Sequence, residues 1–420
     1  MFGGPCVKGC VSGFGIGGIS EPLSPLMEPS LMHIALIREW FDRMHGGAER
    51  YAVTLAEHLR ARGHRVTVIC DRWVEDDARG FEMLRVPFRR YLGPFAYERF
   101  AVETGAAAER CGADVTLALA RSFGGDLCRV GDLLQQSWIE ANWPDEQKRR
   151  SKLRWAWRVR RRLKLEQAIF SRARFHRIVA ISRLVQEQLL RHFNLTPAQV
   201  CVMHNGVDFG RFSPPDRAKA AACRRALGLP EDALVALFVG MDFRRKGLGA
   251  AAAGFVHASR IAAPEVRRRL FLVAVGRGDE QLALRVSREL ECPGRVMVLP
   301  RTPRIEECFA AADVLVHPSK ADPGANVVLE ALASGVPAVV SRYTGNADFI
   351  DPGRNGFVLR ERQNAQEIGE AILRVVSGRE RDFAAGRVRS CSRLLSHVEH
   401  FQAMEALLKE AAQARASVAS

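Results

Sequence analysis

The chain has 420 residues, enough for two domains with full hydrophobic cores, and its 47% hydrophobic and 26% charged residues are ordinary for a globular protein. It contains no run of 18 apolar residues, which argues against a membrane-spanning helix, and its ten cysteines form no Cys-x-x-Cys pair, which argues against a zinc site or a disulfide framework. The 62 lysines and arginines exceed the 47 acids by 15, and this excess requires an anionic partner such as a nucleotide, a nucleic acid or a membrane surface.

Residues 1–31 are rich in glycine and proline and carry few charges. Glycine dilutes the apolar residues too strongly for the core of a signal peptide, and Lys8 is the one basic residue ahead of them. We predict a disordered N-terminal extension, or an over-long start upstream of Met32. A cleaved targeting segment is the alternative.

The first predicted domain covers residues 32–212 and begins with a strand at 33–37. The loop that follows ends in Gly46 and Gly47, ahead of a helix with apolar residues on one face. Glycines at this position would let a phosphate approach the backbone N–H groups of the helix N-terminus, although a tight turn without a ligand explains them as well. Further strands are expected at 65–70, 82–86, 115–118, 177–181 and 200–203, with Ser182 capping a helix that ends near Phe193.

Residues 148–174 hold twelve lysines and arginines and a single acid, Glu166, so they carry a net charge of +11. Trp155, Trp157 and several aliphatic residues are interleaved with these charges. A basic helix with aromatic anchors is typical of a segment that lies on an anionic membrane surface. A nucleic-acid-binding helix, or a solvated face packed by one apolar stripe, remains open.

The second predicted domain, residues 213–389, follows a linker at 209–216 that contains Ser-Pro-Pro. Strands are expected at 234–239, 270–275 and 296–299. Arg245 and Lys246 come just after the first of these strands, where open α/β sheets bind ligands, and they could neutralise a diphosphate.

Residues 313–341 read as a strand, a loop broken by Pro323 and Gly324, a helix that stops at Gly335, and a second buried strand. Asp322 lies in the loop, and Glu330 lies eight residues later on an otherwise apolar helix. A buried carboxylate requires hydrogen-bond partners, which sugar or ribose hydroxyls would supply. A solvated glutamate is the alternative.

The pair Asp322 and Glu330, followed by Ala331, resembles the signature of retaining glycosyltransferases of the GT-B fold, family 4 type, which carry two acids separated by seven residues. The first acid of that family is usually glutamate, so Asp322 is one methylene shorter. The Arg-Lys-Gly run at 245–247 is similar to that of the lipopolysaccharide-core α-1,3-glucosyltransferases within the family. The resemblance extends from about Met32 to about Val376. It implies an α/β protein with two Rossmann-like, doubly wound domains facing across a cleft, and a helix at about 390–415 that crosses back to the first domain.

The resemblance also implies roles for individual residues. Glu330 would hold the nucleotide ribose, and Asp322 a hydroxyl of the donor sugar. Residues 121–132 are read as a loop; many relatives place a histidine there, whereas this chain has none and offers Asp126, for which a turn or cap role is the alternative. The implied catalytic residues are Asp126, Arg245, Lys246 and Asp322. The implied donor-binding residues are Gly46, Gly47, Arg245, Lys246, Arg301, Asp322, Ala325, Asn326 and Glu330.

The expected function is transfer of a hexose, glucose by resemblance, from a nucleotide diphosphate sugar to a saccharide acceptor with retention at the anomeric carbon. The donor is expected to be UDP-linked, and the acceptor to be lipopolysaccharide core or another cell-surface glycan or glycolipid. No acidic cluster of the DxD type is visible, so neither a metal nor another cofactor is expected. We expect a cytoplasmic protein held peripherally on the inner face of the cell membrane through residues 148–174, without a nucleic-acid partner. The alternatives are a non-hydrolysing nucleotide-sugar epimerase and a nucleic-acid-binding protein built on 148–174.

Overall fold

The structure is a computed structural model that describes residues 31–419, apart from residues 94, 173–174, 279–280, 282–293, 362 and 378–393. The predicted extension therefore lies outside the described residues except for Leu31. The same holds for residues 173–174 of the basic segment and for 390–393 of the predicted last helix.

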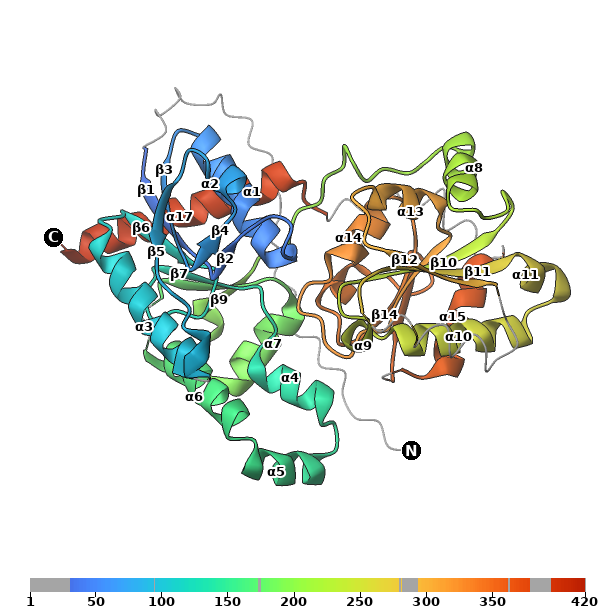
Figure 1. Ribbon diagram of the computed structural model, residues 1–420, viewed down its shortest axis with the longest axis horizontal. Coiled ribbons are helices and arrows are strands. Elements are labelled where there is room, and N and C mark those ends of the chain that lie inside the picture. The colour runs from blue at the N-terminus through green and yellow to red at the C-terminus, as the bar shows by residue number, and fades with distance from the viewer. Residues whose placement is uncertain are drawn as a thin grey trace, which may run out of the picture. The chain divides into compact units, whose positions relative to one another are not determined.

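The first half of the chain forms a seven-stranded sheet in which all neighbouring strands are parallel (Figure 1). The chain winds outward from β1 in one direction and from β6 in the other, which is the doubly wound pattern with its switch point between these two strands. In sheet order the strands are β5 (Glu82–Arg85), β3 (Arg65–Cys70), β1 (His33–Ile37), β6 (Val115–Ala118), β7 (Leu127–Val130), β8 (Arg177–Ala180) and β9 (Val200–Val202). A separate pair consists of β2 (Trp40–Phe41) and β4 (Arg72–Trp73).

The second half of the chain forms a six-stranded parallel sheet with the same winding, and its switch point lies between β10 and β13. In sheet order its strands are β12 (Val296–Pro300), β11 (Leu270–Gly276), β10 (Leu234–Gly240), β13 (Val314–His317), β14 (Ala338–Ser341) and β15 (Gly356–Leu359). Most of these strands are apolar and buried on both faces, as expected of parallel sheets covered by helices. The predicted α/β class with two Rossmann-like domains is confirmed.

Helices connect the strands of each sheet. In the first half they are α1 (Gly47–Ala61), α2 (Glu75–Ala78), α3 (Phe95–Arg110), α4 (Gln135–Asn142), α5 (Glu146–Trp155), α6 (Trp157–Arg172) and α7 (Arg183–His192), with 3₁₀ turns η1 (Arg90–Leu92) and η2 (Pro197–Gln199). In the second half they are α8 (Arg217–Ala226), α9 (Phe243–Lys246), α10 (Leu248–Ile261), α11 (Pro264–Arg269), α13 (Ile305–Ala311), α14 (Asn326–Ala333) and α15 (Ala365–Val376), with the 3₁₀ turn η3 (Gly345–Phe349). The predicted Ser182 cap is confirmed, since its hydroxyl accepts a hydrogen bond from Val185 N at 3.2 Å.

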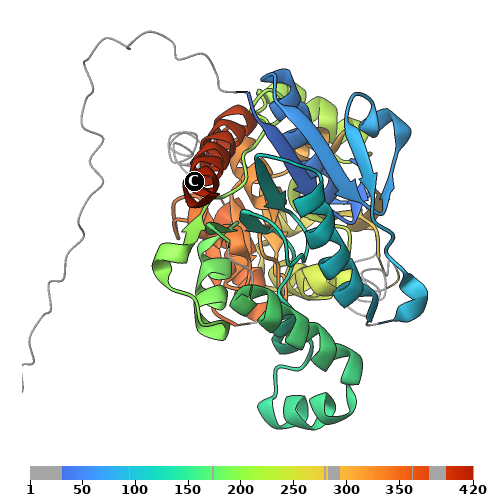
Figure 2. The ribbon, with the colours of Figure 1, turned by 90° about the vertical axis from the view of Figure 1, so that its left-hand side faces the viewer.

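Two sequence predictions fail in the first half. Residues 121–132 are not one loop, because β7 runs through them and pairs with both β6 and β8. The basic segment is not a single helix, because Ala156 leaves the helical conformation and separates α5 from α6. Leu165, Ile169 and Phe170 of α6 are buried, whereas Trp155 is 82% exposed. In Figure 2 the green helices at the bottom of the view, α5 among them, extend away from the strands.

The helix α17 (His397–Ala419) follows the second sheet in sequence but packs on the first. Its residues Phe401, Met404 and Leu408 are buried in one cluster with Leu36 of β1 and Val68 of β3. Along the stretch of chain that the structure describes, none of the helices has the length and apolar character needed to cross a bilayer.

Candidate active site

A cavity of about 640 Å³ lies at the carboxyl ends of strands from both sheets. The first sheet contributes residues that follow β1 and β7, and the second contributes residues at or just after the ends of β10, β11, β12 and β13. Parallel α/β sheets bind ligands at this edge and near the switch point, and here both switch points supply residues to one cavity. The predicted residues that line it are Gly46, Gly47, Arg245, Lys246, Arg301, Asp322, Ala325, Asn326 and Glu330.

Asp322 forms the centre of a buried polar cluster at the second sheet. Its carboxylate pairs with Lys246 Nζ, lies 2.9 Å from His317 Nε2, and accepts a hydrogen bond from Ala325 N at 3.2 Å. Burial disfavours the charge on Asp322, but Lys246 and His317 outweigh it and hold the pKa of this carboxyl below its ordinary value. Asp322 is therefore an anion at neutral pH.

Lys246 and Arg245 follow β10 on the short helix α9. Burial lowers the pKa of Lys246, and the neighbouring Asp322 acts against that shift. The Arg245 guanidinium donates a hydrogen bond to Ala321 O at 3.0 Å and lies 3.2 Å from Asp242. Two cations thus line the cavity beside the buried carboxylate.

The backbone at the start of α14 takes an unusual conformation. Ala325, the residue before Asn326, has φ of +46°, which is uncommon for a residue with a Cβ atom. This turn lets Asp322 accept from Ala325 N and places Asn326 Oδ1 2.7 Å from Nδ2 of Asn205, which lies just beyond β9 of the first sheet.

Glu330 lies one turn further along α14 and is partly buried. Among the described side chains, none donates a hydrogen bond to its carboxylate. Burial raises its pKa to about 7, while the charges of Arg50 and Arg211 act in the opposite direction. A carboxylate in this state is available to ligand hydroxyl groups.

Gly46 and Gly47 form the N-terminus of α1 at the other side of the cavity. A Cβ atom on Gly46 would lie 2.6 Å from Oε2 of Glu49, so a larger residue at this position would require the Glu49 side chain to move. Arg301, which follows β12, donates a hydrogen bond to Met44 O at 2.7 Å in the same loop.

Several cavity residues were missed by sequence reasoning, and they lie in the first sheet. Arg38, directly after β1, is buried and pairs with Glu49 and Asp132, each at 2.7 Å. Burial disfavours its charge, but these two acids raise the pKa of Arg38 above its ordinary value. Arg129 in β7 is also buried; it donates to Asn205, and its guanidinium carbon lies 3.6 Å from the centre of the Tyr51 ring. Their positions at carboxyl ends of strands were the one available signal.

Asp126 does not line this cavity. It precedes β7, at the edge of the sheet opposite to the ligand-binding edge, and its carboxylate accepts from Thr116 N at 2.7 Å and lies 3.2 Å from Arg415. Asp132 follows the same strand and does line the cavity. Because residues 121–132 were predicted as one loop, the sequence could not show that Asp126 and Asp132 lie at opposite ends of a strand. The position of Asp126 gives no support to the catalytic role expected for it.

Comparison with known proteins agrees with this geometry. The family model described as Glycosyltransferase Family 4 matches residues 45–211, and that described as Glycosyl transferases group 1 matches residues 220–386. The chain is 22% identical over 339 residues to the lipopolysaccharide glucosyltransferase WaaG of Escherichia coli (strain K12), covering 79% of this chain and 86% of that protein. It is 32% identical over 211 residues to D-inositol 3-phosphate glycosyltransferase 1 of Catenulispora acidiphila, covering 48% of this chain and 49% of that protein.

Solved structures show the same fold. The crystal structure of WaaG superimposes with a TM-score of 0.76 at 19% identity, covering 89% of this chain and 99% of WaaG. HepE from Anabaena, in complex with UDP and glucose, superimposes with a TM-score of 0.67 at 16% identity, covering 90% of this chain and all of HepE (100%). The chain, a family 4 domain followed by a group 1 domain, therefore belongs to the glycosyltransferases of the GT-B fold.

Proposed function

We propose that this glycosyltransferase moves a hexose, glucose in the first instance, from a UDP-linked donor to a hydroxyl of a saccharide, with retention at the anomeric carbon. The observation that carries the proposal is the placement of Asp322 and Glu330 in one cavity with Arg245 and Lys246. HepE, which binds UDP and glucose, has the same fold. WaaG, a lipopolysaccharide glucosyltransferase, supports lipopolysaccharide core as the acceptor class.

The donor would span the second-sheet side of the cavity. The Glu330 carboxylate would accept hydrogen bonds from the two ribose hydroxyls, for which it has a free acceptor. Arg245 and Lys246 would face the diphosphate and stabilise the negative charge that develops as it leaves, without a metal ion. Asp322, held by Lys246 and His317, would accept from a hydroxyl of the transferred sugar.

Retention has two possible routes. A double displacement requires a carboxylate free to attack the anomeric carbon. Asp322 is already engaged by a lysine, a histidine and a backbone N–H group, so it is poorly suited to that role. We therefore favour departure and attack on the same face of the sugar, with the acceptor hydroxyl held by groups of the first sheet near Arg38 and Asp132.

The test is turnover of UDP-glucose with a soluble core oligosaccharide, followed by NMR of the product. An α-linked product from the α-linked donor supports the proposal, and a β-linked product contradicts retention. Arg245→Gln should lower kcat, with Arg244→Gln as the matched control, because Arg244 is exposed and does not line the cavity. Equal losses in the two variants would contradict the role given to Arg245.

We also propose that α5 and α6 attach the protein to an anionic membrane surface. Trp155 is 82% and Trp157 46% exposed at the junction of the two helices, between basic residues on both sides. Each such charge contributes up to about 1 kcal/mol near an anionic bilayer, within a Debye length of about 10 Å at 0.1 M salt. Tryptophan favours the headgroup boundary.

Changing Lys152, Arg154 and Lys164 to Gln should strongly reduce co-sedimentation with phosphatidylglycerol vesicles. A control that removes three exposed charges elsewhere, at Arg217, Lys219 and Arg268, should retain it. Binding of the parent protein that is equal for neutral and anionic vesicles would contradict the electrostatic attachment.

A further inference from the structure

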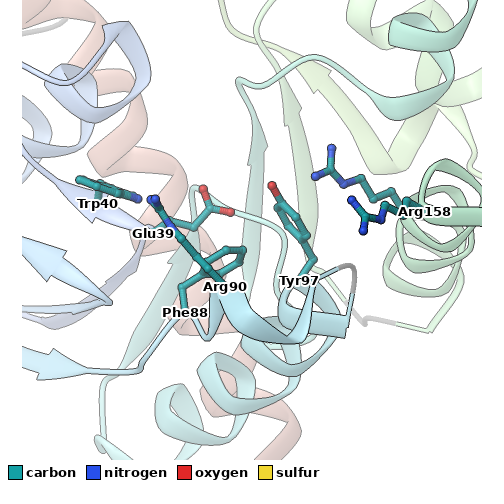
Figure 3. Close-up of a pocket in the computed structure, with 8 residues that line it drawn as sticks. Glu39, Trp40, Phe88, Arg90, Tyr97 and Arg158 are labelled. Carbon is teal, nitrogen blue, oxygen red and sulfur yellow. The ribbon is translucent and has the colours of Figure 1, made fainter.

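A second cavity, of about 340 Å³, lies beside the active site on the first half of the chain (Figure 3). Two consecutive residues line the two cavities: Arg38 lines the active site, and Glu39 lines this cavity. The remaining walls come from β2, the loop around η1, α3 and α6. Its main polar and aromatic residues are Glu39, Trp40, Arg90, Tyr97, Arg158 and Arg162.

Three guanidinium groups of this cavity lack an acidic partner. Within the part of the chain that the structure describes, no carboxylate lies within ion-pair distance of Arg90, Arg158 or Arg162. Two other arginines of this region do have acidic partners: Arg161 pairs with Glu98, and Arg121 pairs with the buried Glu166. The cavity therefore concentrates cations that the protein leaves available.

The three arginines come from two sides. Figure 3 shows Arg90 and Trp40 on one side of the hollow and Arg158 on the other, with Glu39 and Tyr97 between them. The Arg90 guanidinium lies 5.1 Å from the Trp40 ring centre, and that of Arg162 lies 4.4 Å from the Tyr97 ring centre. Arginines oriented in this way keep N–H groups available for phosphate or carboxylate oxygens.

The cavity residues other than the arginines suit the uncharged part of a sugar, its ring and hydroxyl groups. The ring of Trp40 is stacked on His45 at 4.2 Å and that of Tyr97 lies against Arg162, so these two residues offer ring edges and polar tips to a ligand. The Glu39 carboxylate can accept hydrogen bonds from hydroxyls. Burial raises the pKa of Glu39 above its ordinary value, and the charge of Arg38 only partly offsets this shift. One carboxylate against three guanidiniums leaves the cavity net positive, and its volume is sufficient for a monosaccharide unit with one charged substituent.

We propose that this cavity is an acceptor subsite that binds a sugar unit carrying a phosphate or carboxylate group, next to the unit that receives the hexose. The proposal rests on the function proposed above and specifies its acceptor as an anionic saccharide. Arg158 and Arg162 bind the charged substituent, and Glu39 and Trp40 contact the ring. A charged substituent held here would fix which hydroxyl reaches the active-site cavity, because consecutive residues, Arg38 and Glu39, line the two cavities.

The probes are glucose 6-phosphate, glucuronate and glucose, with binding to the full chain measured by calorimetry and ligand-observed NMR. The two charged sugars should bind at least about tenfold more tightly than glucose, and the difference should shrink between 0.05 and 0.3 M salt. Arg158→Gln with Arg162→Gln should weaken binding of glucose 6-phosphate about tenfold. The matched control is Arg160→Gln, which removes a charge from the same helix outside the cavity and should retain binding.

Arg90→Gln changes the opposite wall of the cavity, so it still tests the proposal if the Arg158/Arg162 variant misfolds. Thermal unfolding shows whether each variant is folded. Equal affinity for glucose and glucose 6-phosphate, or equal losses in the Arg160 and Arg158/Arg162 variants, overturns the proposal. A lipid headgroup is the other source of phosphate. If the Arg158/Arg162 variant loses phosphatidylglycerol vesicles but the parent does not bind glucose 6-phosphate, the subsite is overturned in favour of the membrane.

Binding of UDP-glucose separates this inference from the proposed function. It should be the same in the parent and in all three arginine variants, because none of these residues lines the active-site cavity. A parent that binds UDP-glucose but not glucose 6-phosphate contradicts the subsite alone. A parent that binds glucose 6-phosphate but not UDP-glucose contradicts the proposed donor.

Discussion

Lys246 and Asp322 combine a structural and a chemical task at one ion pair. Lys246→Met would leave the buried Asp322 carboxylate with His317 and one backbone N–H group, and loss of one partner of a buried pair costs about 3–5 kcal/mol. We expect urea unfolding to show this loss. Turnover should also fall about 10²- to 10³-fold, by analogy with the loss of one oxyanion donor.

The double variant Lys246→Met with Asp322→Asn separates the two tasks. Removing both charges should restore most of the free energy of unfolding, because no unpaired buried charge remains. Turnover should stay low. Recovery of turnover together with stability would show that Lys246 acts on the fold alone.

Glu330 predicts a pH dependence of donor binding. Its pKa of about 7 in the free protein exceeds the ordinary 4.5, so the carboxyl favours the folded state below pH 4.5 and loses that contribution as the pH rises through 7. If only the ionised form accepts from ribose, UDP-glucose should bind about tenfold more weakly at pH 6 than at pH 8. Calorimetry on Glu330→Gln should show weaker binding with little pH dependence. A parent whose affinity does not change between pH 6 and 8 would contradict the assignment.

The donor-side residues were predictable because they follow apolar strands or interrupt an apolar helix, as Lys246 and Glu330 do. Arg38 and Arg129 were not predictable, because their partners Asp132 and Asn205 are distant in sequence. A buried arginine is costly unless it is paired, and pairing is a property of the folded chain. All assigned roles stay predictions, whereas the positions are now known.

At the scale of elements, most strands were predicted within one or two residues, because buried parallel strands are continuous apolar runs. β7 was missed because it has only four residues, follows two glycines, and contains Arg129. Gly124 is needed there, since a Cβ atom on it would lie 2.5 Å from the Cα atom of Gly105 in α3. Gly124 does lie in the loop, and the error was to extend that loop through the short strand that follows it.

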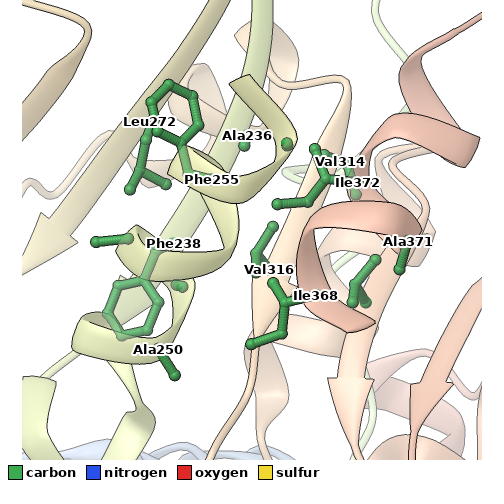
Figure 4. Packing of buried hydrophobic residues seen from close by; sticks show 14 of the residues in the cluster. Ala236, Phe238, Ala250, Phe255, Leu272, Val314, Val316, Ile368, Ala371 and Ile372 are labelled. Atoms are coloured by element: carbon green, nitrogen blue, oxygen red, sulfur yellow. The ribbon is translucent and has the colours of Figure 1, made fainter. Parts of the chain in front are cut away.

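Another close contact of this kind joins α10 to α15 in the core of the second sheet (Figure 4). A Cβ atom on Gly254 would lie 2.3 Å from Cγ2 of Ile368, and one on Gly369 would lie 2.7 Å from Gly254 O. Gly254→Ala should therefore lower the free energy of unfolding by about 1–3 kcal/mol, despite the higher helix propensity of alanine. Gly210→Ala is the control, because that loop position meets only the Asp208 side chain at 3.3 Å. Equal urea midpoints for the two variants would show that the helices separate freely.

At the scale of the whole molecule, Glu405 links α17 to the first half of the chain, through contacts with His58 in α1 and with Arg62 and His64 just after it. Burial raises its pKa, but hydrogen bonds from Lys409, His64 and Arg62 prevail and hold the pKa at about 2. Because this value lies below the ordinary 4.5, the carboxylate stabilises the fold above pH 4.5 and loses that effect as the pH falls toward 2.

Glu405→Gln should therefore lower the free energy of unfolding by about 3 kcal/mol at pH 7. The difference between parent and variant should shrink steadily below pH 4.5, as measured by urea unfolding at several pH values. Glu399→Gln serves as a control on the same helix, since that side chain is exposed and, among the residues that the structure describes, accepts a hydrogen bond from Ser396 N alone. A difference that stays constant down to pH 3 would contradict the ion cluster.

The packing of α17 has a consequence for the order in which the protein is made. The last strand of the first sheet ends at Val202, but the helix that covers Leu36 and Val68 begins at His397. At a ribosome rate of about 5–20 residues per second, about 10–40 s separate the two. During that interval the nascent chain can complete the β10–β15 sheet, while the apolar surface of the first sheet stays exposed until α17 is made. We expect ribosome-associated chaperones to act on the N-terminal half of the chain. We also expect the C-terminal half to become resistant to protease before the N-terminal half does.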